Sequence, residues 1–294
     1  MTLSACLLSH RALVRVTGND KATFLQGLIS NDVNKLSPEV ALFALLLSPQ
    51  GRYQFDLILH LEGEDWLLEV DAARALSLIK RLSVFRLRSN VTFEVVEDRA
   101  ILAVWGEEVA SCLSLEGGLG ETQATSWGTA VLDPRLIALG ARLIIRSEDV
   151  EQICHQYGIK LCSVSDYRYH RYQLGIPEGG EEIEVDRAIP LEWGMDELNA
   201  IDWNKGCYMG QELTARTRYR GLVRKRIFPV YAPGITLEQP ILAAETEVGH
   251  WIAKEQDWGL AMVRLNAIDA QLTCDGQVLT IICPSWMKLP ENND

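Results

Sequence analysis

Apolar and polar residues follow a regular order of strand and helix patterns along this chain. Strands are predicted where apolar residues alternate or form short runs, at residues 12–16, 40–47, 52–61, 66–70, 91–96, 101–105, 130–132 and 141–145. Helices are predicted where apolar residues recur at helical spacing, at residues 71–86, 148–157 and 163–175. Because strands and helices do not alternate strictly, this order favours an α+β fold with antiparallel sheets. Residues 228–287 alternate and turn often, which is typical of a small β-domain.

Two of these segments have a predicted apolar face. In residues 52–61 this face carries Tyr53, Phe55, Leu57, Leu59 and Leu61. Asp56 points to the other face, where it is either a carboxylate in solvent or part of a site. In the helix at residues 71–86, the residues expected to face the core are Leu76, Ile79, Leu82 and Val84.

One short segment, residues 205–212, combines features that a reactive loop requires. Gly206 and Gly210 bracket Cys207 and an aromatic residue, and a helix-forming run follows. Backbone N–H groups at a helix N-terminus favour a thiolate, and Lys205 adds a positive charge nearby. Cys207 is therefore either a reactive or ligating thiolate or a small apolar residue in a packed turn. The reactive interpretation assigns chemical roles to Cys207, Lys205, Gln211 and Glu212.

The motif Lys-Gly-Cys-Tyr-x-Gly-Gln-Glu at residues 205–212 resembles the signature of the YgfZ-type folate-binding proteins. These proteins are relatives of the glycine-cleavage T protein and are implicated in iron–sulfur cluster assembly and repair. Residues 205–230 are most similar to the mitochondrial-type branch of this GcvT-like family and its bacterial counterparts. The resemblance implies a T-protein-like three-part ring around a folate-sized cavity. It places a folate-binding region of two intertwined α+β subdomains at residues 1–222 and a C-terminal β-barrel at residues 223–294.

The resemblance implies a folate-linked accessory factor for the assembly or repair of [4Fe–4S] proteins. The partners that it implies are A-type iron–sulfur carrier proteins and [4Fe–4S] client proteins. Cys207 offers one thiolate, and no internal set of four cysteines presents itself, so a transient cluster shared with a partner is expected rather than a resident one. A folate-dependent aminomethyltransferase-like protein and a tRNA-modification accessory protein are the alternatives.

The resemblance also implies a site for tetrahydrofolate, with Asp56, Gln173, Tyr208 and Arg216 as its residues. Relatives carry Arg-x-Glu-x-Gly, whose glutamate grips the pterin, and Gln173 stands at the position of that glutamate. An amide cannot form the charge-assisted pair, so weaker or altered binding is expected. Asp56 matches a catalytic aspartate of the T protein, but Phe55 replaces the acid beside it. Aminomethyl transfer is therefore not expected, and whether the protein turns over any substrate stays open.

Charge is distributed unevenly along the chain. With 28 basic and 40 acidic residues the net charge is −12, which argues against nucleic-acid binding by the whole surface but not by a local patch. Residues 216–226 hold six cations and no acid. This run is either a solvated strand edge paired with acids elsewhere or a site for an anion, such as a folate tail, RNA or an acidic partner.

The seven cysteines are scattered and form no Cys-x-x-Cys pair. Neither a disulfide framework nor a zinc site is indicated, and no resident metal is expected. Cys112 and Cys154 lie in apolar helical patterns and Cys283 in a strand-like run, so Cys207 is expected to be the most reactive thiol. A reducing compartment fits, either the bacterial cytoplasm or the mitochondrial matrix for a processed organellar chain. No apolar run reaches the length of a membrane span, so no membrane partner is expected. The protein is also expected to be a monomer.

Overall fold

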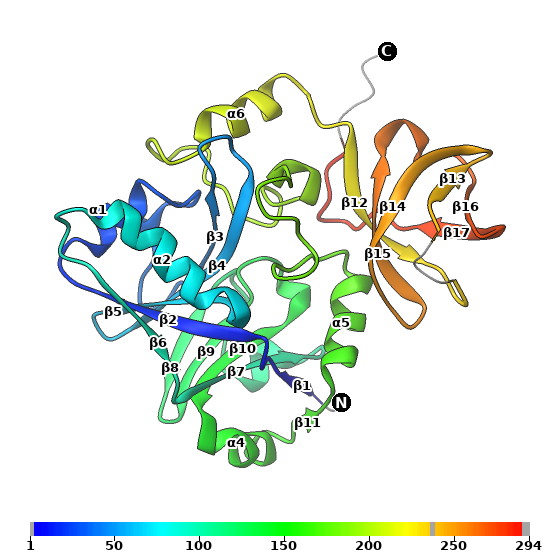
Figure 1. The fold of residues 1–294 in the computed structure, drawn as a ribbon. Helices are drawn as coiled ribbons and strands as arrows, with labels where there is room; N and C mark the ends of the chain where they lie inside the picture. The colour runs from blue at the N-terminus through cyan, green and yellow to red at the C-terminus, as the bar shows by residue number, and fades with distance from the viewer. Residues whose placement is uncertain (1–2, 236–238, 290–294) are drawn as a thin grey trace.

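The computed structural model describes residues 3–235 and 239–289 and shows two sheets beside a small barrel (Figure 1). The first sheet has the strand order β3-β4-β5-β2-β6, and every neighbouring pair is antiparallel. Its strands are β2 (Arg11–Thr17), β3 (Leu42–Leu47), β4 (Tyr53–Glu62), β5 (Asp65–Asp71) and β6 (Thr92–Val96). Helices α1 (Lys21–Gln26) and α2 (Ala75–Arg86) share one hydrophobic core with this sheet.

The second sheet has the strand order β11-β1-β7-β10-β9-β8. Its strands are β1 (Ser4–Leu7), β7 (Arg99–Trp105), β8 (Thr122–Thr125), β9 (Gly128–Leu132), β10 (Ala141–Arg146) and β11 (Lys160–Leu161). Only the β1–β11 pair is parallel among these neighbours. Helices α3 (Val109–Cys112) and α4 (Val150–Gln156) contribute Val109 and Ile153 to the core of this sheet.

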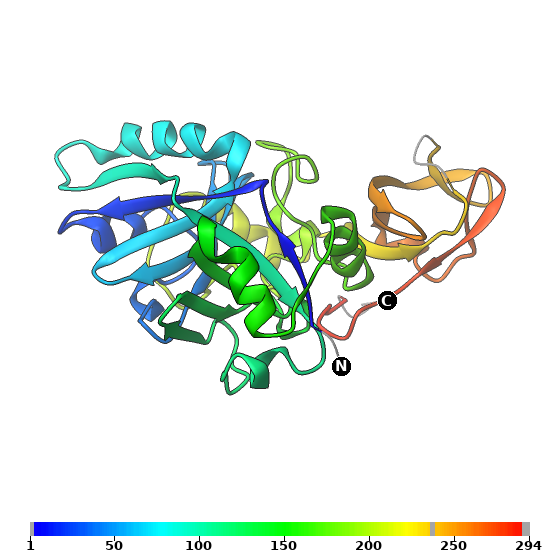
Figure 2. The same cartoon turned by 90° about the horizontal axis from the view of Figure 1, so that it is seen from below.

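The C-terminal part is a closed six-stranded barrel in the order β12-β15-β14-β13-β16-β17. Its strands are β12 (Lys225–Tyr231), β13 (Ile241–Ala243), β14 (Thr246–Glu255), β15 (Trp258–Arg264), β16 (Leu272–Cys274) and β17 (Gln277–Ile281). Helix α5 (Val164–Gln173) lies between the sheets and the barrel, which stands to one side in Figure 2. Ser163 and Asp166 form a capping box at its start, and Trp286 donates to the carbonyl of Leu174 just past its end.

The predicted α+β class, the antiparallel sheets and the C-terminal barrel are confirmed. The first barrel strand begins at Lys225, and the domain division at residue 222 stays a prediction. Residues 290–294 of the predicted second domain lie outside the described residues. None of the helices in the described ranges is long and apolar enough to cross a membrane.

The predicted apolar face of β4 is wrong at one residue. The β3–β4 register shifts because Leu46 pairs with Phe55 while Leu47 pairs with Tyr53, so β4 contains one extra residue, Gln54. A bulge of this kind turns the side chains before it to the opposite face. Tyr53 therefore lies on the face of Asp56, in a different core from Phe55.

The predicted buried face of α2 is also partly wrong. Leu76 and Val84 are exposed, whereas Leu78 and Leu82 are fully buried. A 3₁₀ turn, Ala72–Arg74, precedes the helix, so α2 begins later than predicted. Its sequence offers apolar residues on two sides, and the core takes the side that carries Leu78 and Leu82.

Candidate functional site

Lys205 attaches the predicted reactive loop to the segment that follows α1. Its Nζ donates hydrogen bonds of 2.8, 2.7 and 2.8 Å to the backbone carbonyls of Gln26, Ile29 and Asn31. Burial lowers the pKa of Lys205 from its ordinary 10.5 to about 8. The ammonium group directs its three donors to these carbonyls, and its effect on the Cys207 thiol stays a prediction.

Cys207 lies next to residues that are fixed inside the protein. Tyr208, which was predicted to contact a cofactor, is buried with its ring centroid 5.2 Å from Nζ of Lys205. Met209 donates its backbone N–H to the carbonyl of Gly27 at 3.1 Å. Cys207 itself is exposed. The loop therefore presents a thiol to solvent on a backbone that is anchored on both sides.

The two glycines of the loop meet different requirements. Gly210 has a φ of +82°, and a Cβ atom there would lie 2.5 Å from the carbonyl oxygen of Ser48 in the β3–β4 turn. Gly206 has no atom within 4 Å of its Cβ position, so a side chain there would meet open space. Of the two, Gly210 alone is required by its backbone angle and by close packing.

Exposure does not by itself single out Cys207 among the seven cysteines. Cys6, Cys154 and Cys274 are buried, and burial raises the pKa of Cys6 to about 11. Cys112 and Cys283 are exposed, like Cys207. Within residues 3–235 and 239–289, no group of three or more His, Cys, Asp or Glu side chains could hold a metal ion.

The motif continues into α6 (Gln211–Tyr219), which starts directly after Gly210. Gln211 is half-buried, whereas Glu212 and Arg216 are exposed. Nη2 of Arg216 lies 3.2 Å from Oε1 of Glu212, one turn away. These two predicted site residues therefore pair with each other on the helix surface.

The six cations of residues 216–226 form two groups. Three are paired with carboxylates, in the pairs Arg216–Glu212, Lys225–Glu192 and Arg226–Glu197. Arg218, Arg220 and Arg224 have no ion pair with any residue that the structure describes. The guanidinium carbon of Arg218 lies 4.2 Å from the ring centroid of Trp203 and 5.8 Å from that of Tyr219. Half of the run is thus a paired surface, and the other half is available to an anion.

A cavity of about 700 Å³ lies between α5, the ends of strands in the first two sheets and the barrel. Its lining comes from the β1–β2 turn, the end of β5, α5, the loop after α5 and β14. The residues are Ser9, His10, Arg168, Arg171, Tyr172 and those at 71–74, 178–182 and 252–254. Pockets of this size hold small-molecule ligands.

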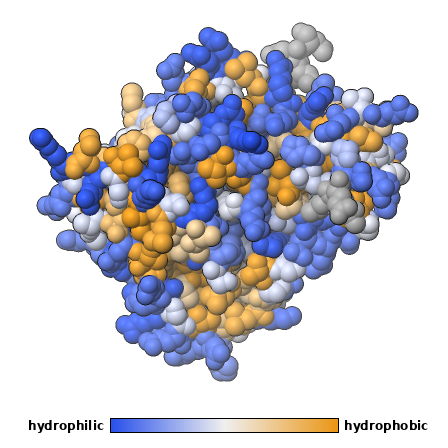
Figure 3. Space-filling view, viewed as in Figure 1, coloured by the Kyte–Doolittle hydropathy of each residue, from blue (hydrophilic) through white to orange (hydrophobic). Residues whose placement is uncertain are grey.

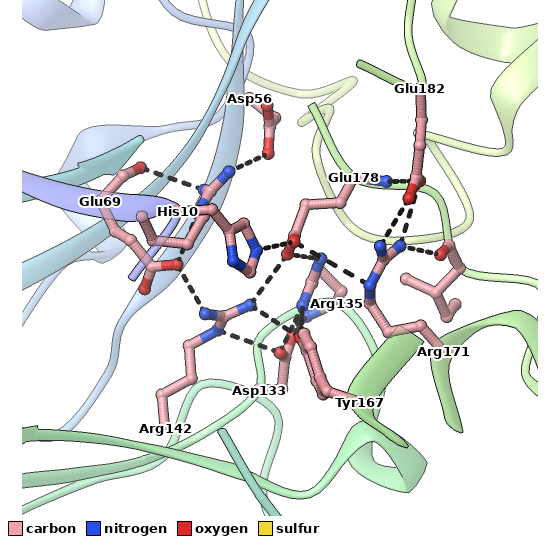
Figure 4. A network of polar contacts seen from close by, with 12 residues as sticks. His10, Asp56, Glu69, Asp133, Arg135, Arg142, Tyr167, Arg171, Glu178 and Glu182 are labelled. Carbon is pink, nitrogen blue, oxygen red and sulfur yellow. Dashed lines mark hydrogen bonds and ion pairs between the residues drawn. The ribbon is translucent and has the colours of Figure 1, made fainter. Parts of the chain in front are cut away.

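A network of buried ion pairs borders this cavity (Figure 4). Its charged members are Arg11, Arg135, Arg142, Arg171, Asp56, Glu69, Asp133, Glu178 and Glu182. Arg142 of β10 donates to Glu69 of β5 at 2.5 Å, and Arg11 of β2 donates to the same carboxylate at 3.0 Å. Arg135 and Arg142 both reach Glu178, at 3.2 and 3.4 Å. The network therefore joins the two sheets to the loop after α5.

The arginines favour the ionised forms of the buried Glu178 and Glu69. Burial alone would raise the pKa of Glu178, yet Arg171 and His10 hold that pKa well below its ordinary value. Burial also raises the pKa of Glu69, but the charge of Arg142 outweighs this effect and lowers that pKa. Because a buried charge without a partner is costly, each member depends on the others.

Two predicted folate contacts lie elsewhere than expected. Asp56 is buried, and its Oδ1 accepts a hydrogen bond of 2.7 Å from the hydroxyl of Tyr53. Gly179 covers it so closely that a Cβ atom on Gly179 would lie 1.8 Å from this oxygen. Gln173 is exposed at the last residue of α5 and does not line the cavity. The structure therefore does not bring Asp56 and Gln173 together in this cavity, because Gly179 separates Asp56 from it and Gln173 faces solvent.

Other polar groups line the cavity, and sequence reasoning missed them. Nδ1 of His10, Oδ1 of Asp71 and Nε of Arg171 are buried without a hydrogen-bond partner among the described residues. Such groups are suited to a polar ligand. The one sequence signal near them is the glycine- and acid-rich stretch at residues 177–186. The other two predicted contacts, Tyr208 and Arg216, do not line this cavity.

Several known proteins are similar to this chain. The family model described as "CAF17, C-terminal beta-barrel domain" matches residues 224–289. The iron-sulfur cluster assembly factor IBA57, mitochondrial, of Homo sapiens is 36% identical over 291 residues, which cover 91% of this chain and 80% of that protein. The mouse protein of the same name is 34% identical over 95% of this chain and 84% of its own. The IBA57 homologue of Neurospora crassa is 36% identical over 79% of this chain, which spans 55% of that longer protein.

One solved structure shows the same fold. The glycine cleavage system aminomethyltransferase T from Bartonella henselae has a TM-score of 0.79 over 97% of this chain and 86% of its own, at 14% identity. This similarity confirms the T-protein-like fold and carries nothing about activity. The identity and coverage of the human and mouse proteins are what establish the family. The chain belongs to the family of the iron–sulfur cluster assembly factor IBA57, within the GcvT- and YgfZ-like proteins that its motif resembles.

Proposed function

We propose that this protein is a folate-linked accessory factor in the assembly or repair of [4Fe–4S] proteins, and that it acts through Cys207. The observation that carries this proposal is an exposed thiol on a loop anchored by Lys205 and Tyr208. Relatives of the chain are named iron-sulfur cluster assembly factors. Thiolates are the ligands of iron–sulfur clusters, so an accessible and fixed thiol suits transient ligation.

In this proposal the cluster is cargo that the protein shares with a partner. Cys207 supplies one thiolate, and an A-type carrier protein supplies the remaining ligands before a [4Fe–4S] client receives the cluster. Helix α6 offers a docking surface with Tyr219 75% exposed and with the cations Arg218, Arg220 and Arg224 outside any ion pair in the described ranges. These charges suit an acidic face on the carrier.

The test is complementation of cells that lack their own factor, read out as the activity of [4Fe–4S] enzymes. Cys207→Ser should abolish complementation while leaving the melting temperature unchanged, because an exposed thiol contributes little to packing. Cys112→Ser and Cys283→Ser are matched controls, since both thiols are also exposed, and both variants should complement. A folded Cys207→Ser protein that complements fully would overturn the proposal.

Tetrahydrofolate is the cofactor that we assign to the 700 Å³ cavity, where it would supply a carrier of one-carbon groups. The oxygen of Asp71 and the ring nitrogen of His10 that lack a hydrogen-bond partner among the described residues suit the polar edge of a pterin. Arg74, Arg168 and Lys254 line the same cavity and suit the carboxylates of the folate tail. The residues present therefore fit tetrahydrofolate. In this assignment Asp71 binds the pterin, the role that the sequence had predicted for Gln173.

Calorimetry with tetrahydrofolate tests this assignment separately from the role of Cys207. Asp71→Asn should weaken binding by about 1.5–3 kcal/mol, the usual contribution of a hydrogen bond to a charged group. Gln173→Glu should leave the affinity unchanged, because the side chain at this position faces solvent. If Gln173→Glu binds tetrahydrofolate more tightly than the wild type, or Asp71→Asn binds it equally well, the assignment to Asp71 is wrong. The pterin site predicted from the sequence, at Gln173, would then be favoured.

RNA is a second candidate for the ligand of α6, favoured by the contact of Arg218 with the rings of Trp203 and Tyr219. The affinity for RNA should fall as the salt concentration rises. An excess of carrier protein should displace the RNA only if both ligands bind this face of α6. The relatives are named as mitochondrial proteins, which supports the mitochondrial matrix. The bacterial cytoplasm stays a prediction.

A further inference from the structure

Helix α2 carries an apolar ridge on the side that faces away from the core. Leu76 and Val84 are 74% and 63% exposed, and Leu87, directly after the helix, is 89% exposed. Leu76, Lys80 and Val84 follow the spacing i, i+4 and i+8, so they lie on one face of the helix, and Leu87 is the first residue after its end. Figure 2 shows α2 in cyan along the upper edge of the molecule, and Figure 3 shows apolar atoms over it with polar atoms on both sides.

The fold does not use this ridge. The opposite side of α2 already packs on the first sheet through Ala75, Leu78 and Leu82. Leu87 has a φ of +44°, a region that a branched side chain occupies at a cost, and its side chain gains no burial in return. The exposure of three large aliphatic residues on and directly after one helix is therefore a feature that stability does not explain.

The segment of chain that carries the ridge is strongly positive, although Asp20 lies near Leu87 and Arg88. Residues 72–93 contain five cations and no acid, in a chain of net charge −12. Two of the five, Arg74 and Arg81, lie over the rings of Phe55 and Phe85. The other three, Lys80, Arg86 and Arg88, are exposed and form no ion pair with any residue in the described part of the chain. Their charge attracts an anionic partner.

We propose that the outer face of α2 docks an acidic amphipathic helix of a partner protein. The ridge at spacing i, i+4 matches the ridges by which helices pack on one another, and Ser77 and Ser83 beside it allow a backbone to approach closely. A bilayer is a poorer match, because no aromatic side chain of α2 points outward and Lys80 lies in the middle of the ridge. This inference is independent of the proposed role of Cys207.

The probe is a synthetic stapled helix with leucines at i, i+4 and i+7 and flanking glutamates, labelled for fluorescence anisotropy. A second peptide has lysines in place of the glutamates. The full-length protein should bind the acidic peptide saturably and the basic peptide at least tenfold more weakly. The double variant Leu76→Ser/Val84→Ser should lose at least tenfold in affinity for the acidic peptide. Ile137→Ser/Val278→Ser, at exposed aliphatic residues outside α2 and α6, should lose none.

Leu87→Gly separates binding from folding. Glycine relieves the positive φ, so this variant should bind the acidic peptide more weakly without a lower melting temperature. Failure of the acidic peptide to bind, equal binding of both peptides, or unchanged binding to the double variant would overturn the proposal. Sedimentation of the wild type with anionic phosphatidylserine vesicles, lost in the double variant, would also overturn it and assign the ridge to a lipid surface.

Discussion

Lys205 is a buried cation whose three donors are all taken by backbone carbonyls. Its partners are 174 to 179 residues away along the chain, so one side chain holds two distant segments together. Loss of the side chain would leave these carbonyls unsatisfied. Carbonyl groups buried without a partner cost about 1–3 kcal/mol each.

We expect Lys205→Met to lower the free energy of unfolding, and the loss to depend on pH. The folded-state pKa of Lys205, about 8, is below its ordinary 10.5, so between these values the folded protein binds fewer protons than the unfolded chain. The contribution of Lys205 to stability therefore rises with pH across this window. Urea unfolding at pH 7.5 and pH 10 should show a larger difference between wild type and variant at the higher pH. A difference that is constant or shrinks would contradict the lowered pKa.

The exposure of Cys207 could be predicted from its neighbours, because flanking glycines leave a small side chain accessible. The burial of Lys205 could not, because it depends on carbonyls that only the folded chain brings near. The same holds for Asp56, which a strand pattern places on one face but cannot place beneath Gly179. Local sequence predicts exposure and element type, whereas the partner of a polar group is set by tertiary structure.

At the scale of elements, the motif loop is held against the β3–β4 turn by Gly210. Alanine at this position would adopt an unfavourable positive φ and bring its Cβ to 2.5 Å from the carbonyl oxygen of Ser48. Gly210→Ala should lower the free energy of unfolding by about 1–3 kcal/mol. Gly206→Ala is the matched control and should change it by less than about 0.5 kcal/mol, because its Cβ meets no atom within 4 Å. Thermal melts that rank the two variants in the opposite order would refute this account of the loop.

Most strands and helices of both sheets were predictable from periodicity, but β1, β8 and β11 were not predicted. The face that each element turns to the core was harder to predict. A bulge at Gln54 reverses Tyr53, and a bulge has no periodic signal of its own. In α2, Leu76 and Leu78 both fit an apolar stripe that includes later leucines, and the core selected the stripe with Leu78. Periodicity therefore identifies an element, and packing decides its rotation.

For the molecule as a whole, the buried ion pairs join the sheets to the loop after α5. Removing one carboxylate leaves arginines buried without a partner, so Glu178→Gln should cost about 3–5 kcal/mol of unfolding free energy. Glu181→Gln, in the same loop and exposed, should cost almost nothing. Because the pKa of Glu178 is lowered, its stabilisation is present above its ordinary pKa and is lost as the pH falls below it. Equal urea midpoints for the two variants at pH 7 would show that Glu178 carries little of this stability.

The architecture could be predicted from element order together with the family resemblance, and the network could not. Its charged residues come from β2, β4, β5, β10, α5 and two loops, and each looks like an ordinary surface charge in the sequence. The burial of the four arginines could not be predicted from the sequence, because arginine is usually exposed. The resemblance implied a cavity, but its lining was missed for the same reason, since His10, Asp71 and Arg171 approach one another only in the fold.

The anchored loop has a consequence for the kinetics of docking. Because the residues on either side of Cys207 are already fixed, a partner does not have to order this segment when it binds, and the entropy lost on association is correspondingly small. A fixed loop also does not sample other orientations of the thiol, so the association rate is limited by the orientation in which the partner arrives. Association should therefore depend on charge around the loop, and hence on ionic strength, more than on any rearrangement of the loop itself.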